Sequence, residues 1–462
     1  MSTLTTEDEV GDELRGLSKP QSGNNAVTRY RSVLPRYIER NENLLELMRI
    51  PTTAEMGEML AFRGVPNDPE LWNAEPSRKI DAMASFDSAY APTEDLTTFS
   101  ERFFARYRRA LSARNFDDEE YRAFFFGARD VMKGARLRPL PASMSSLKGT
   151  GIMLSGPSLM GRSALLQRYR EILKKPFRVY GEGPEPAMMW VVPGLNISYP
   201  ACGTLKGLLV DLRHAIVAAV GRADTPVDIL PEFRGDDAMN AAISACILLN
   251  VGVLVLDGAS FASLEGQPLQ ILQFLVKFQQ YSGIPVVLSG TPAFMHIVGL
   301  AGSKSSNLFS GPSHHFDPFP PPVVDEDSGR AQGHSVWTKL NLWLWSLGLF
   351  SPENLMPVEL PVWTHEFCVG RIGWLVQGFE ALHTALIRKP SLLQYGALTK
   401  ENVARIFEQR LRLQRGAREV ATECMYAGKI EDKTDFFDYI DHLPLSFIRK
   451  AGYREWLKAT AR

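Results

Sequence analysis

Cysteine is scarce in this chain, and its spacing excludes two common ways of stabilising a fold. The 462 residues contain only four cysteines, Cys202, Cys246, Cys368 and Cys424, which lie far apart. Disulfide frameworks and cysteine-based zinc sites need cysteines at short, repeated intervals. We therefore expect neither feature, and a reducing, cytoplasmic compartment.

An excess of charge of either sign is also missing. The 51 Lys and Arg residues nearly balance the 52 Asp and Glu residues, so the formal net charge is −1. Such a chain has no overall positive field to attract nucleic acid. Any contact with DNA must come from local basic patches.

Targeting and membrane-spanning patterns are absent as well. The first ten residues contain no basic stretch followed by an apolar segment, so we expect no signal peptide. The most apolar window, residues 241–256, includes Ser244 and Asn250 and is too short to cross a bilayer. With 45% hydrophobic and 22% charged residues, the composition is that of an ordinary globular protein. At roughly 150 residues per domain, the length predicts about three domains.

One glycine-rich stretch stands out. Gly151-Ile-Met-Leu-Ser-Gly-Pro-Ser-Leu-Met-Gly-Arg-Ser163 has the pattern of a short buried strand, a loop and the start of a helix. This is the order of a phosphate-binding P-loop, Gly-x-x-x-x-Gly-Lys-Ser/Thr, in which backbone N–H groups and a helix N-terminus hold an anion. Apolar spacing up to Leu173 favours the helix, and Pro176 ends it. An ordinary glycine turn is the alternative, and the flanking strand and helix favour the P-loop.

The loop departs from the motif where a lysine normally reaches the outer phosphates. Arg162 occupies that position, and a guanidinium does not replace an ammonium at a tight phosphate site without a change in geometry. The replacement weakens the expectation of ATP turnover more than that of ATP binding. The predicted nucleotide contacts in the loop are Gly156, Pro157, Ser158, Gly161, Arg162 and Ser163.

A second segment fits the same site. Val251-Gly-Val-Leu-Val-Leu-Asp257 is an apolar run that ends in an acid, as a buried parallel strand does in P-loop proteins that hold Mg²⁺. Asp257 and the hydroxyl of Ser163 are therefore predicted to bind Mg²⁺, the alternative being that Asp257 caps a turn. Gly258 follows, where an ATPase of this kind has a glutamate that orients water, so no catalytic residue is assigned.

Further segments carry a family resemblance. They are the P-loop with its flanks, Leu195–Leu208, His315–Pro320 and Leu360–Leu375, the last with a Gly370-Arg-Ile-Gly373 core. Together they resemble the TniB/TnsC family of AAA+ transposition regulators, with degenerate Walker A and Walker B motifs. The resemblance spans roughly residues 130–410.

The resemblance implies an α/β fold: a P-loop AAA+ core with a parallel sheet, a helical N-terminal region and a helical lid. It implies ATP and Mg²⁺ as cofactors. It also implies a homo-oligomer, a ring or a filament, on duplex DNA, with a transposase and a target-selection protein of the same element as partners.

The resemblance also assigns three site positions outside the loop. A polar sensor at the end of the strand near residues 284–290 is Thr291 or Ser289. Arg371, at the start of the lid helix, is the candidate cation near the γ-phosphate, the alternative being a surface arginine. Lys206 lies in the loop after the second core strand, where ring-forming AAA+ proteins line their channel, and is the DNA-contact candidate.

Changes in composition predict five regions. Residues 1–24 are expected to be disordered, and residues 25–149 to form a helical region that ends in a Ser-rich linker. The nucleotide-binding core, with a Pro/Gly-rich loop, is assigned to 150–335 and the lid to 336–420. Residues 421–462 are a C-terminal tail expected to bind partners.

Two arginine-rich segments could bind DNA phosphates. A solvated helix face is the favoured interpretation of both. They comprise Arg102, Arg106, Arg108, Arg109 and Arg114, and Arg405, Arg410, Arg412, Arg415 and Arg418.

Three functions are compatible with these features. The first is an ATP-dependent regulator of DNA transposition with weak or no ATP hydrolysis. The second is a hydrolysis-competent P-loop NTPase that remodels DNA or protein, and it lacks a water-orienting residue. The third is a nucleotide-free adaptor that keeps the AAA+ fold as a scaffold.

Overall fold

The computed structural model describes most of the chain. The described residues are 34–131, 134–148, 151–180, 188–221, 237–300, 311–323, 335–394, 396–450 and 452–453. The expectation that residues 1–24 are disordered lies outside them.

Five parallel strands form the central sheet. They are β1 (Ile152–Ser155), β4 (Leu195–Ser198), β5 (Leu254–Ala259), β6 (Val286–Gly290) and β7 (Ser313–His315). Their order across the sheet is β4-β5-β6-β1-β7, and every neighbouring pair is parallel. The carboxyl ends of all five strands therefore meet at one edge. A separate antiparallel pair consists of β2 (Phe177–Tyr180) and β3 (Met188–Val191).

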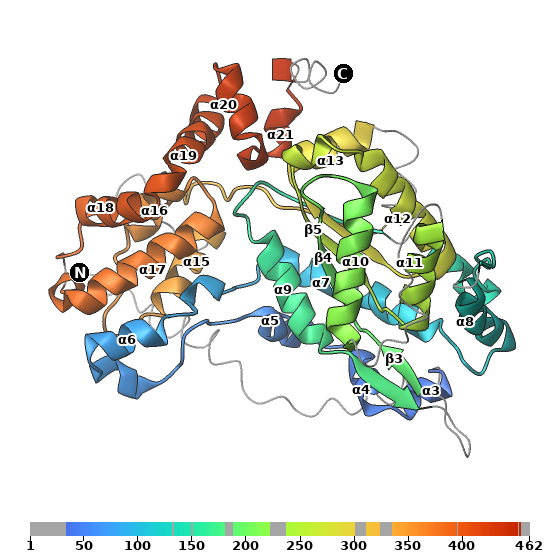
Figure 1. Ribbon diagram of the computed structural model, residues 1–462. Coiled ribbons are helices and arrows are strands. Elements are labelled where there is room, and N and C mark those ends of the chain that lie inside the picture. The colour runs from blue at the N-terminus through green and yellow to red at the C-terminus, as the bar shows by residue number, and fades with distance from the viewer. Residues whose placement is uncertain are drawn as a thin grey trace.

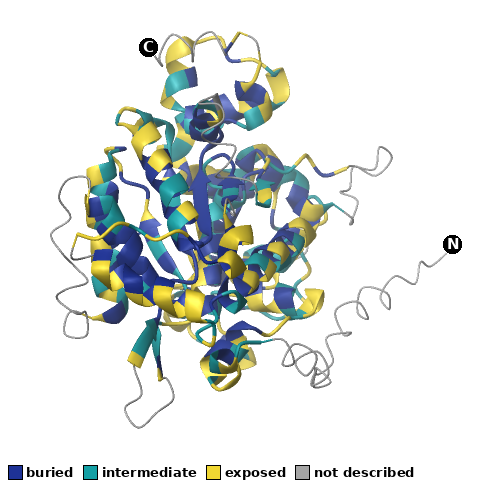
Figure 2. Cartoon of the chain, turned by 90° about the vertical axis from the view of Figure 1, so that its right-hand side faces the viewer, coloured by how far each residue is buried: buried dark blue, intermediate teal, exposed yellow. Residues whose placement is uncertain are grey.

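The strands alternate their apolar side chains between two covered faces. In β5, Leu254 and Leu256 pack into one hydrophobic cluster, whereas Val255 packs into another on the opposite face. Because helices cover both faces, the central strands β1, β5 and β6 begin as apolar runs, as is usual for a parallel sheet. Figure 2 shows the dark blue, buried strands at the centre with exposed residues outside them.

Different helices cover the two faces (Figure 1). One face packs against α8 (Glu119–Val131), α10 (Leu205–Val220), α11 (Asp237–Leu248) and α12 (Pro268–Ser282). The other packs against α3 (Arg36–Glu39), α4 (Glu42–Leu47), α5 (Thr53–Leu60), α7 (Glu94–Ser112) and α9 (Arg162–Leu173).

A helical lid lies beside the sheet with a hydrophobic cluster of its own (Figure 1). Its buried centre includes Trp337, Trp374 and Phe379. Its helices are α15 (Val336–Trp345), α16 (Leu360–Cys368), α17 (Ile372–Arg388), α18 (Lys400–Arg410) and α19 (Arg415–Thr422).

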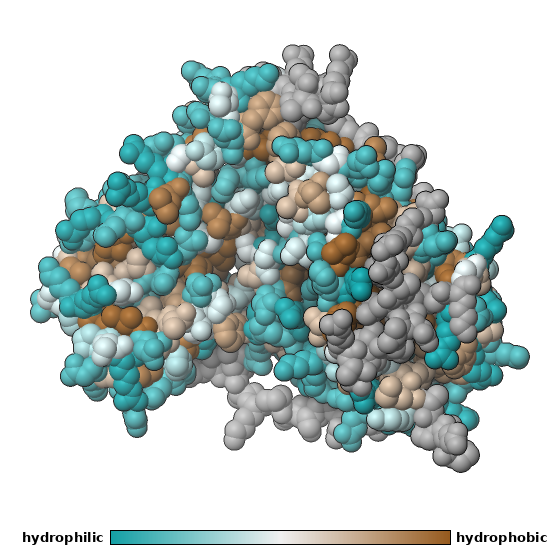
Figure 3. All heavy atoms as spheres, viewed as in Figure 1, coloured by the Kyte–Doolittle hydropathy of each residue, from teal (hydrophilic) through white to brown (hydrophobic). Residues whose placement is uncertain are grey.

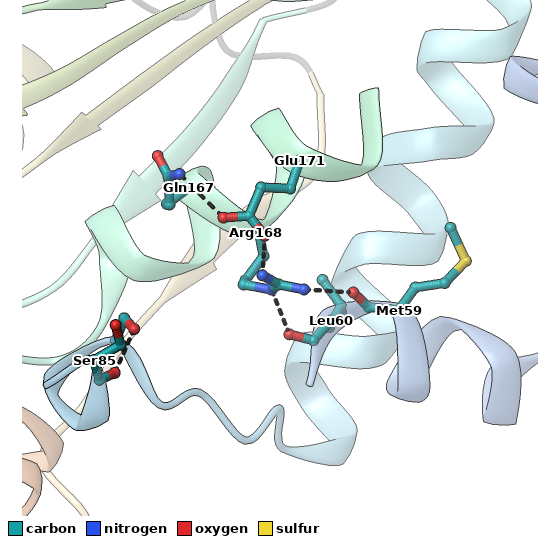
Figure 4. Close-up of polar contacts among 7 residues, drawn as sticks. Met59, Leu60, Ser85, Gln167, Arg168 and Glu171 are labelled. Carbon is teal, nitrogen blue, oxygen red and sulfur yellow. Dashed lines mark hydrogen bonds and ion pairs between the residues drawn. The ribbon is translucent and has the colours of Figure 1, made fainter. Parts of the chain in front are cut away.

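Residues 34–148 are largely helical but do not build a separate core. Their apolar side chains are divided among the two sheet clusters and the lid cluster, and α6 (Pro76–Ala82) packs on the lid. Arg168 joins α5 to α9, because its guanidinium donates to the carbonyls of Met59 and Leu60 (Figure 4). These last carbonyls of α5 have no partner within the helix, so a cation satisfies them well.

The end of the chain packs on the core. We call residues 432–450 the C-terminal segment, which contains α20 (Lys433–Asp438), the short 3₁₀ helix η9 (Ile440–His442) and α21 (Leu445–Ile448). Its apolar side chains form a cluster with Ala293 of α13 (Pro292–Leu300), and α21 lies against α13 (Figure 1).

The architecture is an α/β fold built around a parallel sheet, which confirms the expected fold class at that level. A parallel sheet carries a glycine loop between β1 and α9, and a helical lid lies beside it. Two details differ from expectation. Residues 142–147 of the expected linker form a 3₁₀ helix whose Met144 and Leu147 are buried in the core. The expected Pro/Gly-rich loop contains edge strand β7, because residues 313–315 pair with β1.

Within the described residues, no helix is both long and apolar enough to cross a membrane. On the face that Figure 3 shows, hydrophilic and hydrophobic side chains are interspersed.

The fold should lose stability in mild acid because of His383, a fully buried residue of the lid. Its Nε2 lies 3.1 Å from the carbonyl of Leu344, and burial lowers its pKa to about 4. The unfolded chain takes up a proton as the pH falls below the ordinary value of 6.5, whereas the folded chain resists protonation down to about 4. Between about pH 7 and about pH 5, His383 should cost about 2 kcal/mol of unfolding free energy.

Urea unfolding at the two pH values measures this effect. His383→Gln retains an N–H donor and should show a smaller pH dependence, by about that amount. His214→Gln, at an exposed position, should keep the wild-type dependence. An unchanged pH dependence in His383→Gln would contradict the assignment.

Candidate nucleotide-binding site

The glycine loop connects the central strand to the start of α9. Gly161 is the N-cap of α9 with a left-handed φ of 86°, and Arg162 is the first helical residue. The N–H groups of this first turn have no helical partner and point toward the carboxyl edge of the sheet, where an anion can accept from them. Pro157 is buried, Ser158 is half-buried, and Ser163 is exposed in the first turn of α9.

Arg162 provides a buried donor in this loop. Its Nη1 is shielded from solvent and has no hydrogen-bond partner. Burial lowers the pKa of the guanidinium below its usual value, and the negative charges of Asp257 and Asp441 oppose the shift. A buried, unpaired cationic donor is costly. The loop is therefore suited to an anionic acceptor such as a phosphoryl oxygen.

Asp257 lies at the same edge of the sheet. Its carboxylate accepts a hydrogen bond from the N–H of Gly258 at 2.8 Å, and its carbonyl accepts one from Tyr199 at 2.6 Å. The side chain is half-buried, so one face stays accessible. In the described part of the chain, no group of three or more His, Cys, Asp or Glu side chains is arranged so that it could hold a metal ion. Any divalent cation here would depend on Asp257, the hydroxyl of Ser163 and phosphate oxygens, a ligand set that suits Mg²⁺.

Gly258 has a backbone that explains why it is glycine. Its φ is +88°, and the pairing of β5 with β6 shifts register between Leu256 and Ala259. A Cβ at Gly258 would meet no neighbour within 4 Å, so the restriction lies in the backbone rather than in space. A side chain at this position strains the chain.

The two sensor candidates differ in their surroundings. Thr291 follows β6, is buried, and donates its hydroxyl to the carboxylate of Asp441 at 2.5 Å. The hydroxyl of Ser289 is buried with no hydrogen-bond partner. Thr291 therefore has its polar group in the site, next to a charged oxygen.

The lid touches the loop directly. The N–H of Gly373 donates to the carbonyl of Leu159 at 2.8 Å. A Cβ on Gly373 would lie 2.9 Å from the Cβ of Leu159, so the close approach requires glycine. The second glycine of the Gly370-Arg-Ile-Gly373 segment thus joins the lid to the loop.

Arg371 is buried rather than exposed in the site. It precedes α17, lies 5.1 Å from the ring centre of Trp374, and donates to the carbonyl of His442. Burial lowers its pKa to about 10. Its Nε has no hydrogen-bond partner. The residue predicted to approach a phosphate therefore contacts the C-terminal segment in this structure.

Asp441 is a residue of the candidate site that sequence reasoning missed. It lies on η9, and its carboxylate contacts Thr291 and the N–H of Phe261. Burial raises the pKa of its carboxyl above the usual value, while those hydrogen bonds and the charge of Arg162 oppose the rise. No motif surrounds Asp441, and it is 150 residues from Thr291 along the chain.

Lys206 is exposed in the first turn of α10, and none of the contacts described above involves it. The preceding Thr204 caps the helix by accepting from the N–H of Gly207, which fixes the end of the β4–α10 loop. The side chain of Lys206 is accessible to a partner.

Several arginines of the two basic segments have structural roles. Arg108 and Arg114 are buried and donate to the carbonyls of Arg49 and Val251. In the second segment, Arg410 pairs with Glu380 and Arg415 with Glu419. The expected solvated face is therefore wrong for Arg108 and Arg114, which are buried, whereas Arg410 and Arg415 are exposed and form surface ion pairs.

Comparison with known proteins finds similarity to solved structures alone. No protein-family model matches, and no curated protein matches. Among solved structures, the chain is similar to the ORC2 protein of Aeropyrum pernix, determined as ADPNP–ADP complexes. The two are 11% identical with a TM-score of 0.34, and the match covers 72% of this chain and 98% of that one. A similarity this low assigns neither a family nor a function.

Restoring a glutamate beside Asp257 should fail to create an ATPase. We expect Gly258→Glu to lower the free energy of unfolding by about 1 kcal/mol, because a residue with a Cβ is strained at the positive φ of this position. It should release no additional phosphate. Gly258→Asn is the matched control and should cost less, since asparagine tolerates left-handed backbone. Urea unfolding and a phosphate-release assay measure both effects, and a stable, hydrolysing Gly258→Glu variant would contradict them.

Proposed function

We propose that this protein binds ATP–Mg²⁺ at the glycine loop, assembles as a homo-oligomer on duplex DNA and couples target-site selection to a transposase. The observation that carries the proposal is the unpartnered, buried Nη1 of Arg162 at the N-terminus of α9. A phosphate would satisfy this donor together with the free N–H groups of the first helical turn.

The neighbouring groups support a nucleotide with its metal. Asp257 and Ser163 offer the carboxylate and hydroxyl that suit a Mg²⁺ ion held mainly by phosphates. Bound ATP would supply the anionic oxygens, and the chain's own contribution would be to orient them. Thr291 has a hydroxyl at the same edge of the sheet.

The role in transposition rests on the resemblance to TniB/TnsC regulators. It is supported by the contact between Gly373 and the loop, which gives the Gly370-Arg-Ile-Gly373 segment a physical function. If ATP binds only the assembled state, its binding free energy stabilises the assembly without hydrolysis. A site without a glutamate at position 258 is suited to this use of the nucleotide.

A nucleotide-free scaffold is the second candidate. It is favoured by one observation: Asp441 already accepts hydrogen bonds from Ser158, Phe261 and Thr291. A hydrolysis-competent NTPase has less support, because Glu265, the acid nearest in sequence after Asp257, is exposed at the end of a 3₁₀ turn.

Substitutions of Arg162 distinguish a protein that binds ATP from a nucleotide-free scaffold. We expect Arg162→Ala to weaken ATP–Mg²⁺ binding roughly 10- to 100-fold, since it removes charge-assisted hydrogen bonds. Arg162→Lys should retain most of the affinity, because lysine serves in other P-loops. Arg170→Ala, at the exposed far end of the same helix, is the matched control and should bind as wild type.

Calorimetry with ATP–Mg²⁺, with and without duplex DNA, measures these affinities, and phosphate release measures turnover. Binding without turnover fits the proposal. Absence of binding in the wild type and in every variant favours the scaffold. Rapid turnover in the wild type favours the NTPase.

Lys206 should contribute to DNA affinity through a single phosphate contact. Lys206→Ala should weaken binding to all duplex sequences similarly and reduce the salt dependence by about one ion. Lys339→Ala, an exposed lysine on α15, is the control. Fluorescence anisotropy across a salt series checks the prediction, and equal salt slopes for wild type and Lys206→Ala would remove Lys206 from the interface.

A further inference from the structure

The C-terminal segment places hydrogen-bond acceptors against the donors of the candidate site. The carbonyl of Asp441 accepts from the N–H of Ser158, within the glycine loop, at 2.8 Å. Its carboxylate accepts from the N–H of Phe261 at 2.9 and 3.2 Å and from the hydroxyl of Thr291 at 2.5 Å. One residue of the tail therefore contacts the loop, the sensor position and the segment after β5.

The next residue engages the lid in the same way. The carbonyl of His442 accepts from the guanidinium of Arg371, and the His442 ring stacks on Trp374 with a centroid distance of 6.1 Å. Two consecutive residues of η9 thus occupy donors from both the core and the lid.

The oxygen atoms that Asp441 and His442 place in these contacts are acceptors, as the oxygen atoms of a phosphoryl group are. A carboxylate and two carbonyls are oxygen acceptors, one of them anionic, and every partner is an N–H, hydroxyl or guanidinium donor. An N–H such as that of Ser158 cannot make full hydrogen bonds to Asp441 and to a phosphate oxygen at once.

We propose that the C-terminal segment is an internal, displaceable occupant of the nucleotide site, and that ATP phosphates and the Asp441–His442 turn compete for the same donors. This inference rests on the proposed function, since it describes how ATP binding at that site is regulated. The structure then represents the closed form, and nucleotide binding requires the turn to leave.

Apolar packing holds the segment in place. Phe436, Ile440, Leu443 and Phe447 are buried in a cluster that includes Ala293 of α13, two residues after Thr291. A pocket of about 320 Å³ that opens to solvent lies between the segment and the lid, lined in part by Arg371, Cys424 and Lys450. Along this pocket the segment and the lid face solvent and not each other, so undocking separates fewer apolar contacts on this side.

Competition between the C-terminal segment and ATP can be measured as a change in the apparent dissociation constant for ATP. If only the undocked chain binds ATP, the apparent dissociation constant equals the intrinsic one divided by the undocked fraction. Removing the Asp441 carboxylate weakens docking and raises that fraction. Asp441→Ala should therefore bind ATP–Mg²⁺ about 10-fold more tightly than wild type.

The test compares ATP–Mg²⁺ binding by the full chain in wild type, Asp441→Ala, Asp441→Asn and Asp438→Ala. Asp438, exposed on α20 three residues earlier, is the matched control and should leave the affinity unchanged. Asp441→Asn keeps the shape and loses the charge, so its affinity should lie between those of wild type and Asp441→Ala. Hydrogen exchange on the wild type should show that ATP increases exchange of the amides in residues 433–448.

The outcomes separate the two proposals. If wild type and Asp441→Ala bind ATP equally well and residues 433–448 keep their protection, the segment does not compete, although the proposed function stands. If Asp441→Ala binds ATP more weakly, Asp441 belongs to the nucleotide site and the inference is overturned. If no variant binds ATP, both proposals fail. Should Asp441→Ala not fold, Asp441→Asn and the wild-type exchange data decide.

Discussion

The parallel pairing of β1 with β6 and of β6 with β5 is the constraint on which the candidate site depends. Parallel strands end at a common edge, so the glycine loop after β1, Thr291 after β6 and Asp257 near the end of β5 gather there. Side chains from segments that are far apart in the sequence thereby lie close together at this edge of the sheet. The apolar alternation of these strands, with helices on both faces, keeps the pairing in register.

Backbone groups of the glycine loop form hydrogen bonds with two other parts of the chain, the lid and the C-terminal segment. The carbonyl of Leu159 accepts from the lid at Gly373, and the N–H of Ser158 donates to the C-terminal segment at Asp441. A ligand that takes over either group changes what holds the lid or the segment. The lid and the C-terminal segment are thus linked through adjacent backbone groups of the loop, and under the proposed function this linkage is a physical basis for a switch.

The two departures from the P-loop pattern have different physical meanings. Arg162 keeps a cation at the loop, buried and without a partner for Nη1, so the chemistry for holding an anion is retained. Gly258 removes a carboxylate, and its left-handed backbone disfavours any side chain there. The site therefore retains a cationic donor suited to a phosphate and has no side chain at position 258, where the P-loop pattern places the residue that orients water. Such a combination suits a protein that uses a nucleotide as a structural ligand.

The sequence alone determined the local parts of this protein. Strand, glycine loop and helix follow from short-range patterns, because apolar periodicity and glycine spacing act over a few residues, and the parallel α/β core follows from their order. Contacts between segments far apart in the chain could not be predicted from the sequence. The burial of Arg371, the division of residues 34–148 among three hydrophobic clusters and the position of Asp441 beside Thr291 depend on packing between distant segments. Tertiary structure decided these because an isolated aspartate in a tail has no local pattern that indicates which donors it will meet.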